Sequence, residues 1–117
     1  MSDDSRSFLP LTPALFHVLV SLADSDRHGY AIIKDIAART DGAVELGTGT
    51  LYGIIKRLLA DALVVETRAP VRNDDPRRRY YRLTPLGRAV AQAEADRLER
   101  TLDAARATTL FRKARTT

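Results

Sequence analysis

The C-terminal part of the sequence contains one uninterrupted helical stretch, and this constrains the fold more than any other feature. Thr84-Pro85 provides a helix N-cap followed by proline at the first helical position. Beyond Gly87, neither glycine nor proline occurs before Phe111. About 27 helical residues rising ~1.5 Å each would span ~40 Å, whereas a compact domain of this length has a radius of gyration of ~13 Å. We therefore predict a helix that extends beyond its own domain.

Small and aliphatic residues recur along this stretch at alternating steps of four and three, which is the seam of a pair of packed helices. Small side chains in such a seam allow two helices to approach closely. The stretch could fold back onto the first helix of its own chain, but we favour packing against the first and last helices of a second copy. The predicted interface of this homodimer comprises Phe16, Ala91, Ala95, Leu98, Leu102 and Ala105.

Three shorter helices are predicted upstream, from apolar residues at helical spacing. The first begins at Thr12-Pro13, a second cap-and-proline signal, and ends before the polar residues 24–28. The second runs from Tyr30 to Thr40 and the third from about Thr50 to Ala60. Between these two helices, alternating residues predict a short strand from Ala43 to Leu46.

Two strand-like stretches follow the third helix, from Leu63 to Arg68 and from Arg79 to Leu83, and a polar loop joins them. Alternation in the first stretch predicts one shared face, made of Leu63, Val65 and Thr67. In the second it turns Tyr81 and Leu83 inward and Tyr80 and Arg82 outward.

The order of these elements predicts a mainly α fold with a small β-hairpin wing. We expect a winged helix-turn-helix with a long C-terminal dimerisation helix. In this organisation residues 1–10 form a disordered N-terminal arm, residues 11–84 the DNA-binding domain and residues 85–117 the dimerisation helix.

Charge and composition narrow the function. The 19 Lys and Arg against 15 Asp and Glu give a net charge of +4, and sixteen of the cations are arginine, whose forked guanidinium suits phosphate and guanine. The absence of cysteine excludes disulfides, thiolate metal sites and cysteine nucleophiles. His17 and His28 lie far apart in the sequence, so we assign them structural roles rather than metal binding. No catalytic triad or phosphate loop stands out, so we predict no catalytic residues, no cofactor and no enzyme.

The sequence also bears on localisation. No apolar run approaches the length of a membrane span, and the polar, acidic start differs from a signal or transit peptide. We expect a cytoplasmic protein with no membrane partner.

A helix-turn-helix places one helix in the major groove, while a wing reaches the neighbouring backbone. The start of the third predicted helix offers backbone amides, hydroxyls and glycines that allow close approach. The predicted DNA-binding residues are Thr48, Gly49, Thr50, Tyr52, Lys56 and Arg57, with Arg77, Arg78 and Arg79 in the wing. The wing arginines could instead be a solvated loop, but their place in a hairpin favours phosphate or minor-groove contact. Tyr30 and Tyr81 are assigned to the core.

These motifs resemble those of the PadR family of transcriptional regulators, in its subgroup with a short C-terminal part. The chain carries Gly49-Thr50-Leu51-Tyr52, Arg57-Leu58, the run RRRYYRLTPL from Arg77 to Leu86, Gly87-Arg88, and upstream His28-Gly29-Tyr30 with Ile33. The resemblance covers roughly Leu11 to Val90. It implies a winged-helix homodimer that usually represses transcription, with a ligand tuning its affinity for DNA.

The sequence departs from the family pattern in two places. After the third helix the family favours an acidic residue and then a glycine, where this chain has Leu59 and Ala62. Because alanine tolerates a left-handed backbone poorly, we expect the closing turn to differ. In the wing, Asp74-Asp75 replace a glycine and an arginine. This acidic pair should repel phosphate and keep the wing tip off the DNA.

The sequence therefore predicts a sequence-specific regulator that binds double-stranded DNA as a homodimer, at an inverted-repeat operator, and represses transcription. Control by a small-molecule effector is possible. One alternative is an adaptor whose winged helix binds a protein. Another is a sensor of hydrophobic ligands with a pore between subunits, against which the absence of tryptophan argues.

Overall fold

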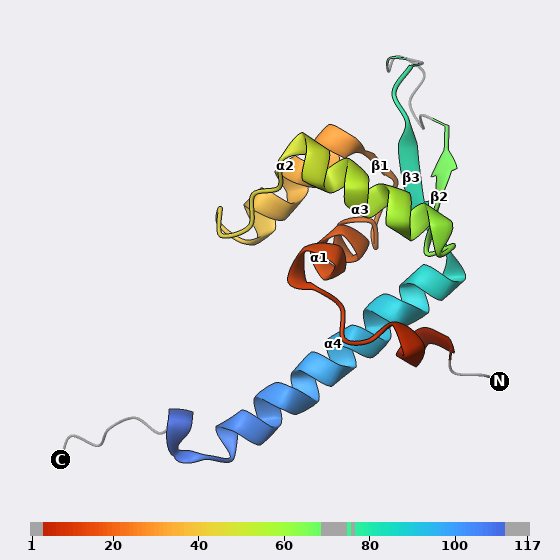
Figure 1. Cartoon of the computed structure of the whole chain (residues 1–117). Coiled ribbons are helices and arrows are strands. Elements are labelled where there is room, and N and C mark those ends of the chain that lie inside the picture. The colour runs from red at the N-terminus through yellow and green to blue at the C-terminus, as the bar shows by residue number, and fades with distance from the viewer. Residues whose placement is uncertain (1–3, 69–74, 76, 112–117) are drawn as a thin grey trace.

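The computed structural model describes residues 4–68, 75 and 77–111. Four α-helices and three short strands make up most of the fold, with a 3-10 helix at each end (Figure 1). In chain order the elements are η1 (Asp4–Phe8), α1 (Pro13–Ser21), β1 (Arg27–His28), α2 (Gly29–Arg39), α3 (Thr48–Ala60), β2 (Val64–Thr67), β3 (Tyr80–Leu83), α4 (Pro85–Arg106) and η2 (Thr109–Phe111). The predicted fold class, mainly helical with a hairpin wing, is confirmed.

Side-chain caps start three of the four α-helices. Thr12 Oγ1 accepts a hydrogen bond from the backbone N–H of Leu15 (3.1 Å), and Thr84 Oγ1 accepts one from that of Gly87 (2.9 Å). His28 caps α2, because its Nδ1 accepts from the N–H of Ala31 (3.2 Å). At α3 the N-cap is Gly47, and no side chain caps the first amides. These amides therefore stay available to a group from outside the chain.

The sheet is antiparallel with the order β1-β3-β2, so the predicted hairpin gains a third strand. In β1, Arg27 pairs with Tyr81 and His28 with Tyr80. The strand predicted from Ala43 to Leu46 is wrong, because that segment follows a tight turn in which Asp41 and Gly42 have positive φ angles. Its apolar residues, Val44 and Leu46, pack against the core without strand pairing.

The hydrophobic core lies between α1, α2, α3, the sheet and the start of α4. Its fully buried members are Val18, Leu19, Ile32, Ile36, Leu51, Leu58, Leu63, Val64 and Val90. Two predicted orientations in the strands are wrong. In β2 the buried valine is Val64, and Val65, predicted to share a face with Leu63, is exposed. Leu63 is buried, but it belongs to the turn that closes α3 and not to the strand, so its orientation does not set that of β2. Tyr80 is buried like Tyr81, since it packs edge-on against the His28 ring of β1 at 5.2 Å.

The turn after α3 keeps a left-handed residue despite the alanine. Ala62 has a φ of 60°. The N–H of Leu63 donates to the Leu58 carbonyl (2.9 Å) and that of Ala62 to the Leu59 carbonyl (3.1 Å), which is the hydrogen-bond pattern of a Schellman motif. The expectation of a different turn is therefore wrong. The N-cap of α4 holds this turn in place, because Thr84 Oγ1 donates to the Ala62 carbonyl (2.7 Å).

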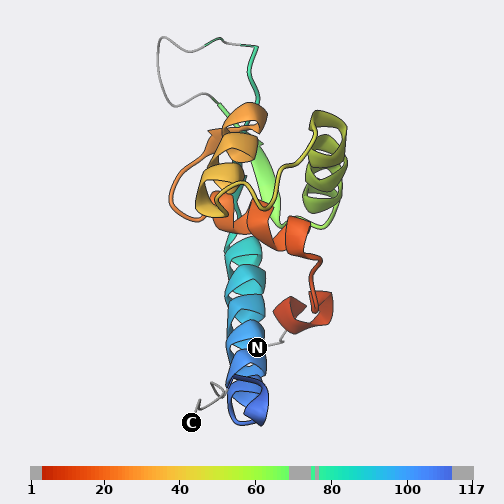
Figure 2. The same cartoon turned by 90° about the vertical axis from the view of Figure 1, so that its left-hand side faces the viewer.

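The last helix, α4, projects away from the domain (Figures 1 and 2). The molecule measures 62 × 37 × 23 Å and its radius of gyration is 17.0 Å, above the ~13 Å of a compact chain of this length. The predicted overhang is confirmed, although α4 ends at Arg106 and not near Phe111. Its first half packs against α1 and η1 of the same chain, and the second half extends beyond the domain, with η2 at its end (Figure 2).

The segment before α1 is more ordered than the sequence predicts. Residues 4–8 form the 3-10 helix η1, which packs on α4, whereas the sequence predicts a disordered arm over residues 1–10. Residues 1–3 lie outside the described part of the chain. Two contacts explain the order: Phe8 and Leu9 pack against the core, and the N–H of Leu11 donates to the carboxylate of Glu94 on α4 (3.3 Å).

Candidate nucleic-acid interface

The start of α2, α3 and the β2–β3 hairpin lie together at the end of the molecule opposite the free end of α4 (Figures 1 and 2). On α3 every side chain predicted to bind DNA is exposed, because the buried face of the helix is made of Leu51, Ile55 and Leu58. The exposed set is Thr48, Gly49, Thr50, Tyr52, Lys56 and Arg57. An exposed, polar and basic helix face next to a hairpin is the geometry that enters a major groove.

The exposed face of α3 also leaves the helix backbone accessible. A β-carbon built at Gly49 or Gly53 would meet nothing within 4 Å beyond its chain neighbours and the nearby backbone of its own helix, and neither residue has a positive φ. Glycine inside a helix costs about 1 kcal/mol relative to alanine. Nothing within the described chain therefore requires glycine at these two positions, and the face is open to close approach from outside.

The three wing arginines are exposed, as the sequence predicts, and all three have partners within the chain. Arg77 pairs with Asp75 through its backbone N–H (2.9 Å) and its guanidinium (3.2 Å). Arg79 lies 3.8 Å from Glu66 on β2. The backbone N–H of Arg77, followed by its guanidinium, lowers the pKa of the Asp75 carboxyl. Asp75 thus holds the base of the wing loop, while Asp74 lies outside the described residues.

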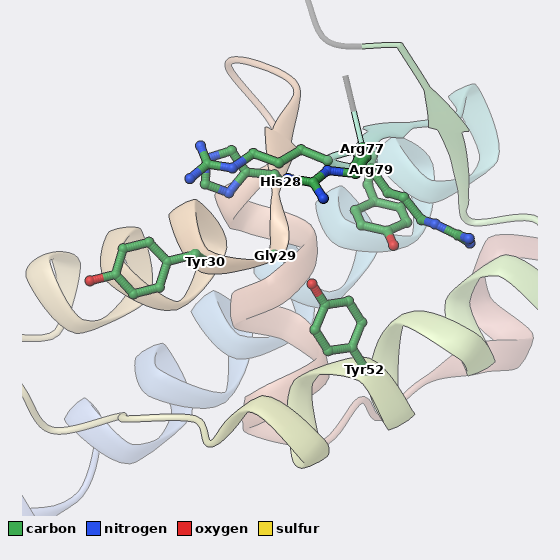
Figure 3. A pocket seen from close by; sticks show the side chains of 8 residues that line it. His28, Gly29, Tyr30, Tyr52, Arg77 and Arg79 are labelled. Carbon is green, nitrogen blue, oxygen red and sulfur yellow. The ribbon is translucent and has the colours of Figure 1, made fainter. Parts of the chain in front are cut away.

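A pocket of about 510 Å³ opens between the start of α2, α3 and the wing. The residues that line it are His28, Gly29, Tyr30, Tyr52, Arg77, Arg78, Arg79 and Tyr81. Figure 3 shows Tyr52 reaching from α3 toward Gly29 and the wing arginines. The Tyr52 hydroxyl lies so close to Gly29 that a β-carbon there would overlap it. The motif His28-Gly29 therefore has a steric reason, which the sequence alone does not reveal.

The tyrosines around this pocket differ from one another. The sequence assigns Tyr30 to the core, but its side chain is 62% exposed and points away from the pocket, and the Lys34 ammonium lies 5.5 Å from its ring (Figure 3). The assignment is wrong because the inner face of α2 is carried by Ile32 and Ile36. Tyr81 is buried, as predicted, yet it also lines the pocket.

His28 has a structural role, as the sequence indicates. Besides capping α2 and packing on Tyr80, its Nε2 lies 3.1 Å from a guanidinium nitrogen of Arg78. The ring therefore connects α2, the sheet and the wing. Within the described ranges, 4–68, 75 and 77–111, no three potential ligands gather that could hold a metal ion.

The residues predicted for the dimer interface lie away from this face. Phe16, Ala91 and Ala95 line a hollow of about 180 Å³ between α1 and α4. Leu98 and Leu102 follow on the projecting half of α4 and are 40% and 41% exposed, and Ala105 is half-buried. The chain thus carries an apolar stripe on α4, separate from the basic end.

Residues 18–93 match the model of the transcriptional regulator PadR-like family. This match covers more than half of the chain and includes α2, α3, the wing and the first part of α4. The chain belongs to the PadR-like family. The family consists of transcriptional regulators, so the PadR-like motifs and the winged-helix geometry lead to the same class of protein.

Two curated bacterial proteins are similar in sequence. A transcriptional regulator of Mycobacterium tuberculosis is 35% identical over 83 residues, which cover 71% of this chain and 73% of that protein. A protein of Lysinibacillus sphaericus is 33% identical over 72 residues. That match covers 62% of this chain and 65% of the Lysinibacillus protein, a little under two thirds of its length.

Solved structures extend the similarity to the whole fold. A transcriptional regulator from Clostridium thermocellum superimposes with a TM-score of 0.70 at 26% identity, covering 97% of this chain and 99% of that one. Bordetella bronchiseptica BpsR, whose DNA binding is regulated by 6-hydroxynicotinic acid, gives a TM-score of 0.61 at 26% identity. The coverage is 89% of this chain and 67% of BpsR. Among the described residues, no helix is long and apolar enough to span a membrane.

Proposed function

We propose that this PadR-like regulator is a repressor that binds a specific double-stranded operator as a homodimer. The observation that carries the proposal is the joint exposure, at one end of the molecule, of the uncapped start of α3 and three wing arginines. In this arrangement α3 enters the major groove and its first turn, with Thr50, faces base edges. The wing arginines lie beside the flanking backbone and contribute affinity that does not depend on sequence.

The projecting half of α4 supports the homodimer. Leu98 and Leu102 are exposed leucines on the half of α4 that projects beyond the domain. A second copy packed along the stripe of Phe16, Ala91, Ala95, Leu98, Leu102 and Ala105 would bury it around a two-fold axis. Two reading helices related by that axis reach successive major grooves, so the operator is an inverted repeat.

The hollow between α1 and α4 is the place where we propose that a small-molecule effector would act. Phe16, Ala91 and Ala95 line it, and all three belong to the proposed dimer stripe. A ligand bound there would change how the two copies sit on each other and thereby the spacing of their reading helices. The regulation of BpsR by 6-hydroxynicotinic acid supports control of this kind in a structural relative.

Selection of DNA fragments from a random pool tests the function directly. We expect the selected fragments to share one inverted repeat, with half-sites ~10 base pairs apart or a multiple of this spacing. Two chains should bind each fragment in sedimentation. If no sequence is enriched and double-stranded DNA is not bound at moderate salt, the protein is not a DNA-binding regulator. Capture of a protein partner would then favour the adaptor alternative, against which the exposed wing arginines argue.

A further inference from the structure

The pocket between α2, α3 and the wing has the composition of an anion site. We call it the tyrosine pocket and define it by its eight lining residues, His28, Gly29, Tyr30, Tyr52, Arg77, Arg78, Arg79 and Tyr81. Three of these are arginines, Tyr52 and Tyr81 add two phenols, the Tyr30 ring points away from the pocket (Figure 3), and no carboxylate is among the eight. The acidic side chains Asp75 and Glu66 are the ion-pair partners of Arg77 and Arg79 and do not line the pocket. A group that fits this lining must carry negative charge and accept hydrogen bonds.

Tyr81 is a second phenol that a group bound in the pocket would meet. Its side chain is only 3% exposed, yet it lines the pocket. Most of the ring is therefore enclosed by the protein, and the part that remains accessible borders the opening. A phenol O–H at such a border can donate a hydrogen bond to an acceptor that enters the pocket.

The Tyr81 phenol is in the state that donates a hydrogen bond. Burial, and then the neighbouring Tyr52, raises the pKa of Tyr81 above its ordinary value of 10.0. At neutral pH Tyr81 thus keeps its proton. A ligand that bonds to this O–H group as donor must therefore present a hydrogen-bond acceptor. Because Gly29 leaves room for the Tyr52 hydroxyl, the second phenol is held at the same pocket.

We propose that the tyrosine pocket holds one phosphodiester group of the DNA backbone. In this site the hydroxyls of Tyr52 and Tyr81 donate to the phosphate oxygens and the wing arginines supply positive charge. The inference rests on the proposed DNA binding and deepens it. It gives Tyr52, which the sequence places among the DNA-binding residues, a contact that fixes the position of the backbone and does not read a base. It also assigns a DNA contact to Tyr81, a residue that the sequence placed wholly in the core.

The position of the pocket favours DNA over a free oxyanion as the source of the phosphate. It lies between α3 and the wing, the two elements that straddle the DNA backbone in a winged helix. A phosphate beside the groove that α3 occupies would face this opening. The phosphate would then tie the reading helix, α2 and the wing to a single point on the backbone.

Replacing each hydroxyl with hydrogen tests the proposal while keeping the rings in place. Tyr81→Phe and Tyr52→Phe should each weaken binding about tenfold, the loss expected for one hydrogen bond to a charged group. The loss should be equal for the selected operator and for random-sequence DNA. Tyr80→Phe is the matched control, because Tyr80 is the neighbouring buried tyrosine on β3 and does not line the pocket. Its affinity should be unchanged, and thermal melting should show that all three variants fold.

A scan of the operator with single methylphosphonates, which remove the charge of one phosphate, identifies the partner. In each half-site, substitution of one particular phosphate should lower the affinity of the wild type. The same substitution should not lower the affinity of Tyr81→Phe, whereas it should lower that of Tyr80→Phe as much as that of the wild type. Free inorganic phosphate at about 10 mM should not compete, because a single anion lacks the many backbone contacts that give DNA its affinity. Competition there would mean that the pocket takes any oxyanion and would overturn its assignment to DNA.

Other outcomes separate this inference from the function on which it rests. If wild type binds DNA but both Tyr→Phe variants bind equally well, the pocket does not hold a phosphate, although the protein still binds DNA. A loss confined to the operator would make Tyr52 a base contact and also overturn the inference. If wild type binds no DNA at all, the proposed function itself fails.

Discussion

Gly87 lies so close to Leu63 that a β-carbon at position 87 would overlap the Leu63 carbonyl oxygen. This approach joins the first turn of α4 to the turn that closes α3. At the same place, Thr84 Oγ1 donates a hydrogen bond to the Ala62 carbonyl and accepts one from the backbone N–H of Gly87. The glycine that the PadR-like motif places after the wing is therefore a packing requirement between two backbones. It fixes the direction in which α4 leaves the domain.

Gly87→Ala should lower the free energy of unfolding by ~1–3 kcal/mol, because overpacking against backbone cannot be relieved by a rotamer change. Urea denaturation measures the effect. Gly53→Ala is the matched control, since nothing lies within 4 Å of a β-carbon there. Alanine at 53 should raise helix stability by up to ~1 kcal/mol. Equal stability of the two variants would contradict the close approach.

Ala62→Gly should stabilise the protein by about 1 kcal/mol. The alanine has a φ of 60°, a conformation that costs an L-residue roughly 1–2 kcal/mol, partly offset by the greater chain entropy of glycine. The urea midpoint should rise without a change in slope. Ala60→Gly, two residues earlier and within α3, should have the opposite sign. A lower midpoint for Ala62→Gly would show that the turn is not left-handed in solution.

The environment of Glu94 predicts that the attachment of the N-terminal segment to α4 weakens in acid. Its carboxylate is buried and accepts hydrogen bonds from Arg97 (2.6 and 2.9 Å) and from the N–H of Leu11. The Arg97 guanidinium is the main cause that lowers the pKa of Glu94 below its ordinary value of 4.5. A lowered pKa stabilises the folded state above pH 4.5, and this stability is lost as pH falls through the lowered value.

Glu94→Gln should therefore cost ~1–2 kcal/mol at pH 7 and nearly nothing in strong acid, where wild-type Glu94 is itself protonated. Thermal unfolding measured from pH 7 down to about pH 1 checks both ends of this comparison. Gln92→Glu, an exposed change on the same helix, should show no such convergence. A difference between wild type and Glu94→Gln that stays constant across the range would mean that the charge of Glu94 plays no part.

The proposed dimer predicts the effect of charge on the apolar stripe. Leu98→Glu combined with Leu102→Glu should give monomers in sedimentation equilibrium, because an unpaired buried charge is costly. Val65→Glu is the control: Val65 is as exposed, at 44%, but lies on the wing. That variant should remain dimeric. A dimeric double mutant at low micromolar concentration would place the interface elsewhere.

The wing arginines should contribute affinity without sequence choice. Changing Arg77, Arg78 and Arg79 to alanine should weaken binding to operator and random DNA alike. The slope of log affinity against log salt should become shallower by ~0.9 for each phosphate that the variant no longer neutralises. Arg82→Ala removes a cation of the same sheet that pairs with Asp26 (2.8 Å) outside the pocket, and it should leave the slope unchanged. An unchanged slope for the triple variant would show that the wing faces only solvent.

Local signals in the sequence are sufficient for most of the fold. Thr12-Pro13 and Thr84-Pro85 mark helix starts correctly, and the two strands of the wing lie where alternation predicts them. Non-local effects are not predictable in this way. Arg27–His28 becomes a strand only because β3 offers an edge 50 residues or more away, as the pairs Arg27–Tyr81 and His28–Tyr80 show. The same pairing buries Tyr80 against His28, which alternation within β3 alone cannot indicate.

The candidate site is predictable only in part for the same reason. The exposed residues of α3 and the wing arginines follow from the pattern, because each belongs to one element whose buried face is evident. The tyrosine pocket requires three elements to meet. The sequence pattern assigns Tyr30 wrongly to the core and misses the pocket-lining role of Tyr81. The residue pattern of a single helix or strand does not indicate which side chains of other elements lie opposite it.

The stretched outline of the molecule bears on how such a regulator can evolve. The stripe on α4 and the residues around α3 sit at opposite ends of a body 62 Å long. In a dimer joined through α4, a change in the stripe alters the distance between the two α3 helices and leaves the surface of each α3 unchanged. A change on α3 alters the half-site and leaves the distance alone. The half-site spacing and the half-site sequence of an operator can thus diverge separately, through mutations in different parts of the chain.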